Sequence, residues 1–99
     1  MLVLPAVVLS VVGCVPRRPA GAPAAGGLAL FQAKGCAHCH AIQGVGGHKG
    51  PDLTHVGSRL KPMEIRTQIL EGGDSMPAYK EVLTAAETKG LIRYLHKLR

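Results

Sequence analysis

The stretch Cys36-Ala37-His38-Cys39-His40 carries the most distinctive chemistry of this 99-residue chain. Two thiols stand three positions apart, and a histidine directly follows the second. The chain has only 3 cysteines, so most of its thiol chemistry lies here. Sulfur and imidazole are both good ligands for metals and reactive groups. The stretch therefore predicts a binding site that uses two sulfur atoms and one ring nitrogen.

The pattern C-x-x-C-H is the attachment signature of c-type haem. Thiols at this spacing can reach the two vinyl groups of one porphyrin and form thioethers. The next residue, His40, then lies under the ring and can place a nitrogen on the iron. The motif predicts one covalent haem c, with Cys36 and Cys39 as its attachment residues and His40 as an axial ligand.

Three other kinds of site use cysteines at this spacing. A redox dithiol normally accompanies a βαβ pattern, which this sequence lacks. Zinc takes four ligands; Cys36, Cys39 and a distant histidine could contribute, but no second C-x-x-C occurs. A disulfide between Cys36 and Cys39 would close a very small loop. A five-residue motif can occur in a sequence by chance, so the flanking sequence has to decide between haem attachment and these other kinds of site.

Composition argues for a small domain that contains something besides protein. Aromatic residues are 3% of the chain, Trp is absent, and 13 residues are Gly and 7 are Pro. Large aromatic side chains dominate the energetics of most cores, and a domain below ~80 residues usually needs a disulfide, metal or cofactor. This excludes a large enzyme or a multi-domain protein and predicts that a bound group fills the middle.

The N-terminal segment has the composition of an export signal. Residues 2–13 are apolar, and as a helix they would span roughly 18 Å, too short for a hydrocarbon core of about 30 Å. The run ends in Val11-Val12-Gly13-Cys14, which resembles the lipobox of bacterial lipoproteins. The resemblance implies a signal peptide over residues 1–13 and a lipid anchor on Cys14. The positively charged start of a signal peptide is missing, and the alternative is that Cys14 is a stray thiol.

Residues 14–26 have linker composition, because small residues, Pro and Gly dominate and no apolar period is present. The folded domain is therefore expected over residues 27–99. The chain has 12 Lys and Arg against 6 Asp and Glu, a formal charge of +6. A basic surface favours acidic partners, although an ordinary solvated surface explains it equally well. No basic stripe with interleaved aromatics occurs, so nucleic acid is not an expected partner.

Residues 27–99 resemble class I c-type cytochromes, which are small monohaem electron carriers. Gly27 and Phe31 precede the haem motif at helical spacing, the segment from Gly50 to Gly57 is similar to the loop after the motif, and a Met76-Pro77 pair follows a Gly-rich break. The resemblance implies an all-α fold of three to four short helices and loops around one covalent haem. It also implies that the N- and C-terminal helices cross.

The resemblance also assigns roles beyond the motif. It implies that the Pro51 carbonyl accepts a hydrogen bond from Nδ1–H of His40, which fixes the orientation of a ligating imidazole. It implies that Met76 is the second axial ligand. The competitor, Met63, follows Pro62 at the start of a helical segment, where methionine is more often core filler than a ligand.

The pattern of the C-terminal segment predicts an amphipathic helix. Thr84 and Glu87 form a capping box at its start. An apolar stripe then recurs at Leu91, Tyr94, Leu95 and Leu98. By the resemblance, Tyr94 should meet Phe31 near Gly27, where the missing side chain lets the two helices approach closely.

The remaining histidines are not expected to bind the iron. His38 occupies a variable position of the motif, and His48, His55 and His96 are expected on the surface or in loops. Cations in segments that flank the haem could steer redox partners with acidic docking faces. These candidates are Lys34, Lys49, Arg59, Lys61 and Lys80.

Together these features predict a one-electron carrier and not an enzyme. A filled iron, with His40 and Met76 on its two faces, leaves no position for a substrate. The expected setting is a monomer in a respiratory or photosynthetic chain, lipid-anchored on the outer face of the bacterial cytoplasmic membrane or in the periplasm. The alternative is a haem sensor or a peroxidase-like protein in which Met76 is a labile sixth ligand.

Overall fold

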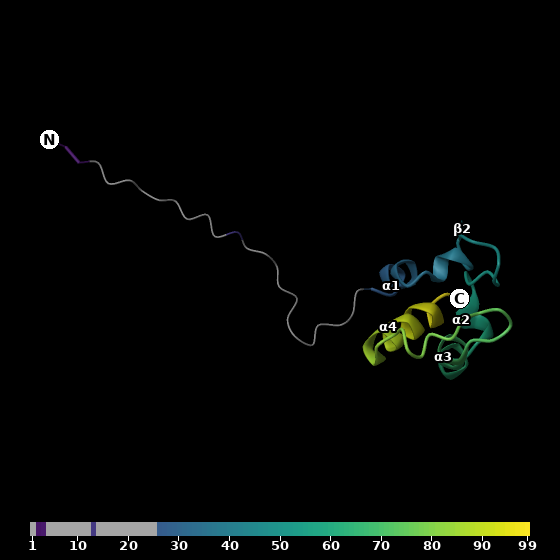
Figure 1. The fold of residues 1–99 in the computed structure, drawn as a ribbon. Coiled ribbons are helices and arrows are strands. Elements are labelled where there is room, and N and C mark those ends of the chain that lie inside the picture. Colours follow the sequence, from purple (N-terminus) through teal and green to yellow (C-terminus); the bar gives the residue numbers. More distant parts are fainter. Residues whose placement is uncertain (1, 4–12, 14–25) are drawn as a thin grey trace.

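A computed structural model describes residues 2–3, 13 and 26–99 of the chain (Figure 1). The fold is mainly helical, as predicted. The elements in chain order are α1 (Gly27–Ala33), the short 3-10 helix η1 (Cys36–His38), β1 (Ala41–Ile42), β2 (Val45–Gly46), α2 (Val56–Arg59), α3 (Pro62–Glu71) and α4 (Ala85–His96). The strands form one small antiparallel ladder, and an isolated antiparallel bridge joins Gly73 and Met76; the rest of the regular structure in the described residues is helical.

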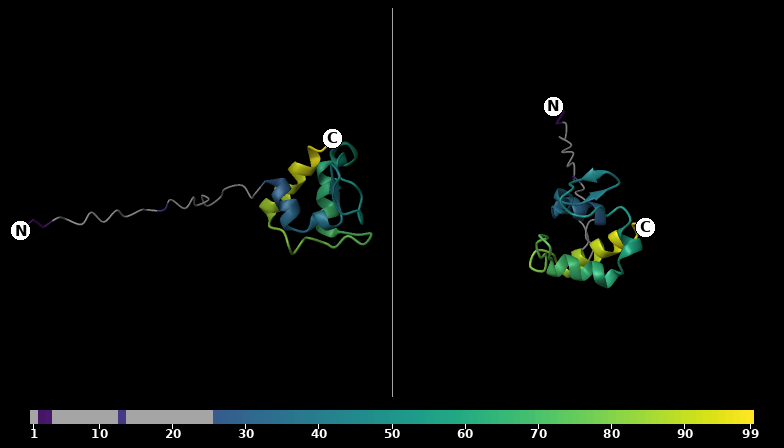
Figure 2. Two further views of the ribbon diagram at one scale, coloured as in Figure 1. Left: turned by 90° about the horizontal axis from the view of Figure 1, so that it is seen from above. Right: turned by 90° about the vertical axis from the view of Figure 1, so that its right-hand side faces the viewer.

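Helices α1 and α4 lie side by side and cross, as predicted (Figures 1 and 2). The crossing point is Gly27, where an added Cβ would overlap Cβ and Cγ of Tyr94. Phe31, one turn further along α1, is buried at 3% exposure. Tyr94 packs against the core cluster that contains Phe31. Only glycine fits at position 27, because any side chain there would push the two helices apart.

The start of α4 is capped as the sequence predicts. The Glu87 backbone N–H donates to Thr84 Oγ1 at 3.1 Å, and the Thr84 N–H donates to Glu87 Oε1 at 3.0 Å. Glu87 also forms an ion pair with Lys34 Nζ at 3.1 Å, just after α1 ends. The same carboxylate therefore caps one helix and links it to the other.

Helix α3 begins at Pro62, and Glu64 Oε1 accepts a hydrogen bond from the Lys61 N–H at 2.9 Å. Ile65 and Ile69 are buried in the core. Met63 is 68% exposed, so its prediction as core filler is wrong. The reason is rotational: Met63 lies two positions before Ile65, about 200° around the helix, and so on the opposite face.

The segment after the haem motif contains a short helix, α2, where the sequence analysis expected only loop. Val56 is buried, and the Gly57 N–H donates to the Leu98 carbonyl at 2.6 Å. Helix α2 therefore packs against the C-terminal residues of the chain. With it the domain has four α-helices among the described residues, within the predicted three to four.

The core is a single apolar cluster with just one buried aromatic residue, Phe31. Its other buried members are Leu30, Ile42, Val56, Ile65, Ile69, Leu91 and Leu95. Cys36 and Met76 pack against this cluster but are only partly buried. The thiol of the haem motif and the candidate axial ligand thus lie at the edge of the core.

The N-terminal predictions fall almost entirely beyond the described part of the chain. Cys14, most of residues 1–13 and most of the linker lie outside residues 2–3, 13 and 26–99. Within those ranges, none of the helices is long and apolar enough to cross a membrane.

Candidate functional site

The haem motif follows α1 through a sharp turn. Gly35 has φ of 80°, which glycine adopts without a steric penalty, and η1 begins directly after it. The His40 N–H donates to the Cys36 carbonyl at 3.0 Å, so the motif is wound into a single turn. Cys36 and Cys39 form no disulfide. Both thiols are therefore available on one short segment, and the disulfide alternative is not adopted.

The environment of Cys36 does not favour thiol redox chemistry. Burial raises the pKa of the Cys36 thiol above its ordinary value of 9.0. A backbone hydrogen bond lowers this pKa, but by less than burial raises it. A reactive dithiol needs a lowered thiol pKa. The strand–helix–strand unit that accompanies such dithiols is also not found in residues 26–99. The chemistry of the pair fits covalent attachment better than thiol exchange.

The imidazole of His40 is held from two sides. Its Nδ1 lies 2.8 Å from the Pro51 carbonyl oxygen. A carbonyl only accepts, so Nδ1 carries the proton and donates. Gly50 lies against the ring, where an added Cβ would stand 2.8 Å from Nδ1 and 3.2 Å from Nε2. This arrangement leaves the Nε2 lone pair free to bind a metal. Histidines that bind metals in other proteins are oriented in the same way, by a hydrogen bond from their other ring nitrogen.

Met76 lies at the end of a tight turn. The Gly73 N–H donates to the Met76 carbonyl at 3.0 Å, and the Met76 N–H donates to the Gly73 carbonyl at 2.9 Å. Asp74 and Ser75 between them have φ of 50° and 76°. Positive φ at both central positions is the geometry of a type I′ turn. The backbone of Met76 is thus fixed although it lies in the long connection between α3 and α4 (Figure 2).

Two side chains that the sequence analysis did not assign lie at this site. Gln68 Nε2 is 3.6 Å from Met76 Sδ and donates to it. Burial raises the pKa of Tyr79 above 10.0, and the nearby Cys36 and Cys39 raise it further. Tyr79, like Cys36, is partly buried and packs against the core cluster. The sequence predicted neither contact. Gln68 and Met76 are only eight residues apart, but they meet only because the turn after α3 folds back toward that helix.

The residues present fit a c-type haem. Two thiols, an imidazole nitrogen and a thioether are the donors that this group uses. Partly buried side chains around them offer apolar contact: Cys36, Ala37, Leu53, Leu60, Met76 and Tyr79. In the part of the chain that the structure describes, no three His, Cys, Asp or Glu side chains are grouped to hold a bare metal ion.

The cations and histidines outside the haem ligands differ in their contacts and exposure. Lys34 is paired with Glu87, and Arg59 Nη2 donates to the Asp52 carbonyl at 2.8 Å. Arg59 is also exposed, as are the side chains of His38, His48, Lys49, His55, Lys61 and Lys80. His96 is half-buried on α4 and lies 3.3 Å from Arg99. The prediction of surface positions is therefore confirmed for His48 and His55.

Comparison with known proteins gives one clear relationship. The family model described as cytochrome c oxidase, cbb3-type, subunit III matches residues 22–95, well over half of the chain. Comparison with curated proteins gave no match. Comparison with solved structures also gave none. The chain therefore belongs to the cbb3-type cytochrome c oxidase subunit III family, and it is a class I c-type cytochrome with covalently bound haem c.

Proposed function

We propose that this protein is a one-electron carrier whose haem iron is held by His40 and Met76. The observation that carries the proposal is the 2.8 Å hydrogen bond from His40 Nδ1 to the Pro51 carbonyl. It orients the ring and leaves Nε2 as the metal-binding atom. The fixed turn at Met76 supports a second ligand from the connection between α3 and α4.

The haem, when bound, supplies reversible one-electron chemistry between ferric and ferrous iron. The protein's part is to fill both axial positions and to keep water out. A thioether ligand such as that of Met76 favours the ferrous state and raises the potential. Leu53, Leu60 and Tyr79 pack at the edge of the core, where they would limit the access of solvent to a bound haem. Two filled axial positions leave none for a substrate, which favours a carrier over an enzyme.

The ligand assignment can be tested with matched methionine variants. In the ferric protein, methionine ligation gives a weak charge-transfer band in the far red. We expect Met76→Ala to lose this band and Met63→Ala to keep it, because Met63 is exposed on α3. A high-spin ferric wild type that readily binds cyanide or carbon monoxide would instead support a sensor or peroxidase-like protein.

We further propose that the protein is exported, anchored through Cys14 and monomeric. The lipobox-like sequence before Cys14 and the linker composition of residues 14–26 support a tethered domain. Two acyl chains or more anchor stably, where one binds only marginally. Mass spectrometry of the native protein should find a lipid on Cys14, and Cys14→Ala should release the protein from membranes. An unmodified Cys14 would remove the anchor.

The family description names a subunit of a cytochrome c oxidase. We therefore propose that the electrons enter a respiratory chain that ends in an oxidase. Lys49 and Lys80 are exposed in segments next to Gly50 and Met76. They offer positive charge close to the proposed ligands for partners with acidic docking faces.

A further inference from the structure

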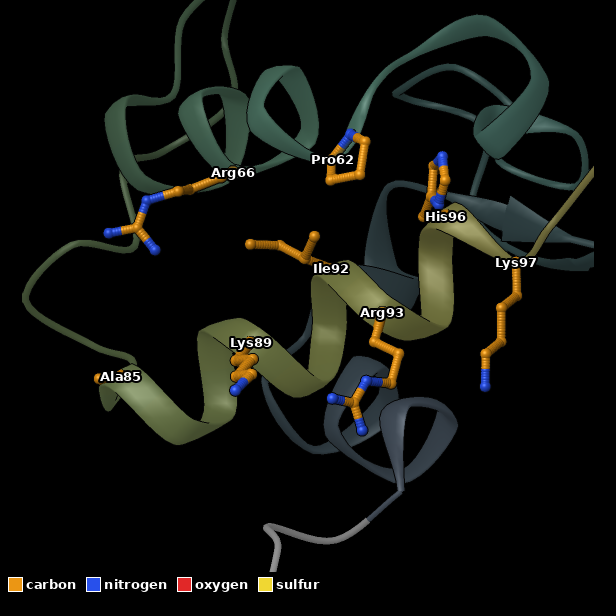
Figure 3. Close-up of a pocket in the computed structure, with 8 residues that line it drawn as sticks. All are labelled: Pro62, Arg66, Ala85, Lys89, Ile92, Arg93, His96 and Lys97. Carbon is orange, nitrogen blue, oxygen red and sulfur yellow. The ribbon is translucent and has the colours of Figure 1, made fainter.

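An open cleft of about 440 Å³ lies between α3 and α4 (Figure 3). Pro62 from α3 and Ile92 from α4 give it an apolar floor, and Ile92 points from α4 toward α3. Four cations also line it: Arg66, Lys89, Arg93 and Lys97. No acidic side chain is among its lining residues. The cleft therefore has an apolar floor and positively charged side chains around it.

These four cations have no ionic partner in the structure. Among residues 26–99 the one salt bridge joins Lys34 to Glu87, and it involves none of them. All four side chains are exposed. They are a third of the 12 Lys and Arg of the whole chain: Arg66 lies on α3, Lys89 and Arg93 on α4, and Lys97 directly after α4. So much unpaired positive charge attracts acidic groups.

The cleft is separate from the haem site. Leu91 and Leu95 point from α4 into the core, against which Cys36 and Met76 also pack. Each residue turns the helix by about 100°. Ile92 therefore lies about 100° around α4 from Leu91, and Arg93 lies about 200° from it. The cleft thus lies on the side of α4 away from Leu91 and Leu95, and Ile92 borders both the cleft and the core. None of the proposed haem ligands, and neither of the exposed lysines near them, lines it.

We propose that this cleft binds an acidic segment of a partner protein, which inserts an apolar side chain between Pro62 and Ile92. From Lys89 to Lys97 the cations extend roughly 12 Å along α4, the length of two turns of helix or a few extended residues. The two arginines can pair with carboxylates through two parallel hydrogen bonds. A concave site with an apolar floor fits a protruding peptide better than a flat anionic membrane, which would reach only the rim.

This contact goes beyond electron transfer. A partner held in the cleft leaves Lys49 and Lys80 uncovered, so a second protein can approach the haem region at the same time. The cleft then acts as a holding site, and the region around the haem stays open for brief encounters.

The test uses the haem-loaded, ferrous full-length protein labelled with 15N. The probe is a 12-residue peptide with four glutamates and one central leucine, and the control peptide carries glutamine in place of each glutamate. We expect the amide shifts to concentrate on α3 near Arg66 and on α4 from Lys89 to Lys97. Arg66→Gln/Arg93→Gln should weaken binding roughly five- to tenfold. Lys49→Gln/Lys80→Gln, with the same change in charge, should leave it nearly unchanged.

Both substituted pairs are exposed, so each variant should keep the melting temperature and haem spectrum of the wild type. The proposal is overturned if the shifts cluster near Lys49 and Lys80, or if the Arg66→Gln/Arg93→Gln variant binds the peptide as tightly as the wild type does. A separate arm uses vesicles of phosphatidylglycerol and phosphatidylcholine. If the arginine variant loses vesicle binding while the peptide binds neither protein, the cleft faces anionic lipid and the proposal is wrong.

Discussion

At the scale of single residues, the site depends on how His40 is held. Its ring has a hydrogen bond on one side, to the Pro51 carbonyl, and the bare backbone of Gly50 on another. The Gly50 N–H itself donates to the Cys39 carbonyl at 2.7 Å, which ties this loop back to the haem motif. The loop therefore positions the imidazole through both contact and hydrogen bonding.

Gly50→Ala should disturb this arrangement, because the new Cβ would stand 2.8 Å from His40 Nδ1. Overpacking of this kind costs about 1–3 kcal/mol. We expect a lower melting temperature and a shifted haem spectrum in the loaded protein. Gly26→Ala is the control, since nothing lies within 4 Å of a Cβ there. Equal melting temperatures for the two variants would contradict the role of Gly50.

Several residue contacts could not be predicted because they depend on which face a helix presents. Met63 and Met76 both looked like candidates for contact with the core or the iron, yet Met63 points into solvent. Gln68 meets Met76 only because α3 runs beside the following turn. Local chemistry, such as the capping box at Thr84 and Glu87, was predictable because it needs only neighbouring residues.

At the scale of elements, the crossing of α1 and α4 organises the domain. The contact at Gly27 and Tyr94 was predictable, because a glycine and an aromatic at helical spacing are part of the family pattern. Helix α2 was not, since its four residues gain their order from the C-terminal segment, through the hydrogen bond from Gly57 to Leu98. Short helices are marginal without such tertiary contacts.

Two alanine substitutions should separate crowding from helix propensity. Gly27→Ala would overlap Tyr94, and we expect a loss of about 1–3 kcal/mol in the free energy of unfolding. Gly90→Ala lies within α4, where its Cβ would meet only Leu30 Cδ1 at 3.4 Å. There the better helix propensity of alanine should add about 0.5–1 kcal/mol. Denaturant unfolding of both variants checks the prediction, and a stable Gly27→Ala protein would refute the close crossing.

The cap of α4 should make stability depend on pH. The backbone hydrogen bond at Thr84 lowers the pKa of Glu87 below its ordinary value of 4.5, and Lys34 lowers it further. A depressed carboxyl pKa stabilises the fold above the unfolded value, and this contribution is lost as pH falls through the folded pKa.

Glu87→Gln removes that titration but keeps an acceptor for the helix cap. Its melting temperature should therefore fall less than that of the wild type between about pH 6 and about pH 3. The matched variant is Glu81→Gln, whose side chain is exposed. If Glu87→Gln follows the wild type over the whole range, the Glu87 carboxylate does not stabilise the cap.

At the scale of the whole molecule, the protein core contains few large side chains. One aromatic side chain is buried, and the cluster borders partly buried residues that would contact the haem. A small domain of this kind usually needs a bound group to be stable. The low aromatic content of the sequence predicted this need, but the packing of Tyr79 against the edge of the core became visible only in the fold.

Cys36→Ala/Cys39→Ala should therefore prevent the domain from folding when the chain is expressed with a cytochrome maturation system. We expect little helical signal in far-ultraviolet circular dichroism and no cooperative thermal transition. A haem-free protein with native helicity and a sharp transition would show that the apolar cluster suffices alone.

The central claim, ligation of the iron by His40 and Met76, is tested most directly by NMR of the ferrous protein with 13C-labelled methionine methyl groups. A methyl group held over a haem lies in its ring current, and its resonance moves far upfield. We predict that one methyl resonance is shifted in this way and that it disappears in Met76→Ala, while the Met63 resonance stays at its ordinary position. A spectrum with every methionine methyl unshifted, or with Met63 shifted instead, would contradict the account.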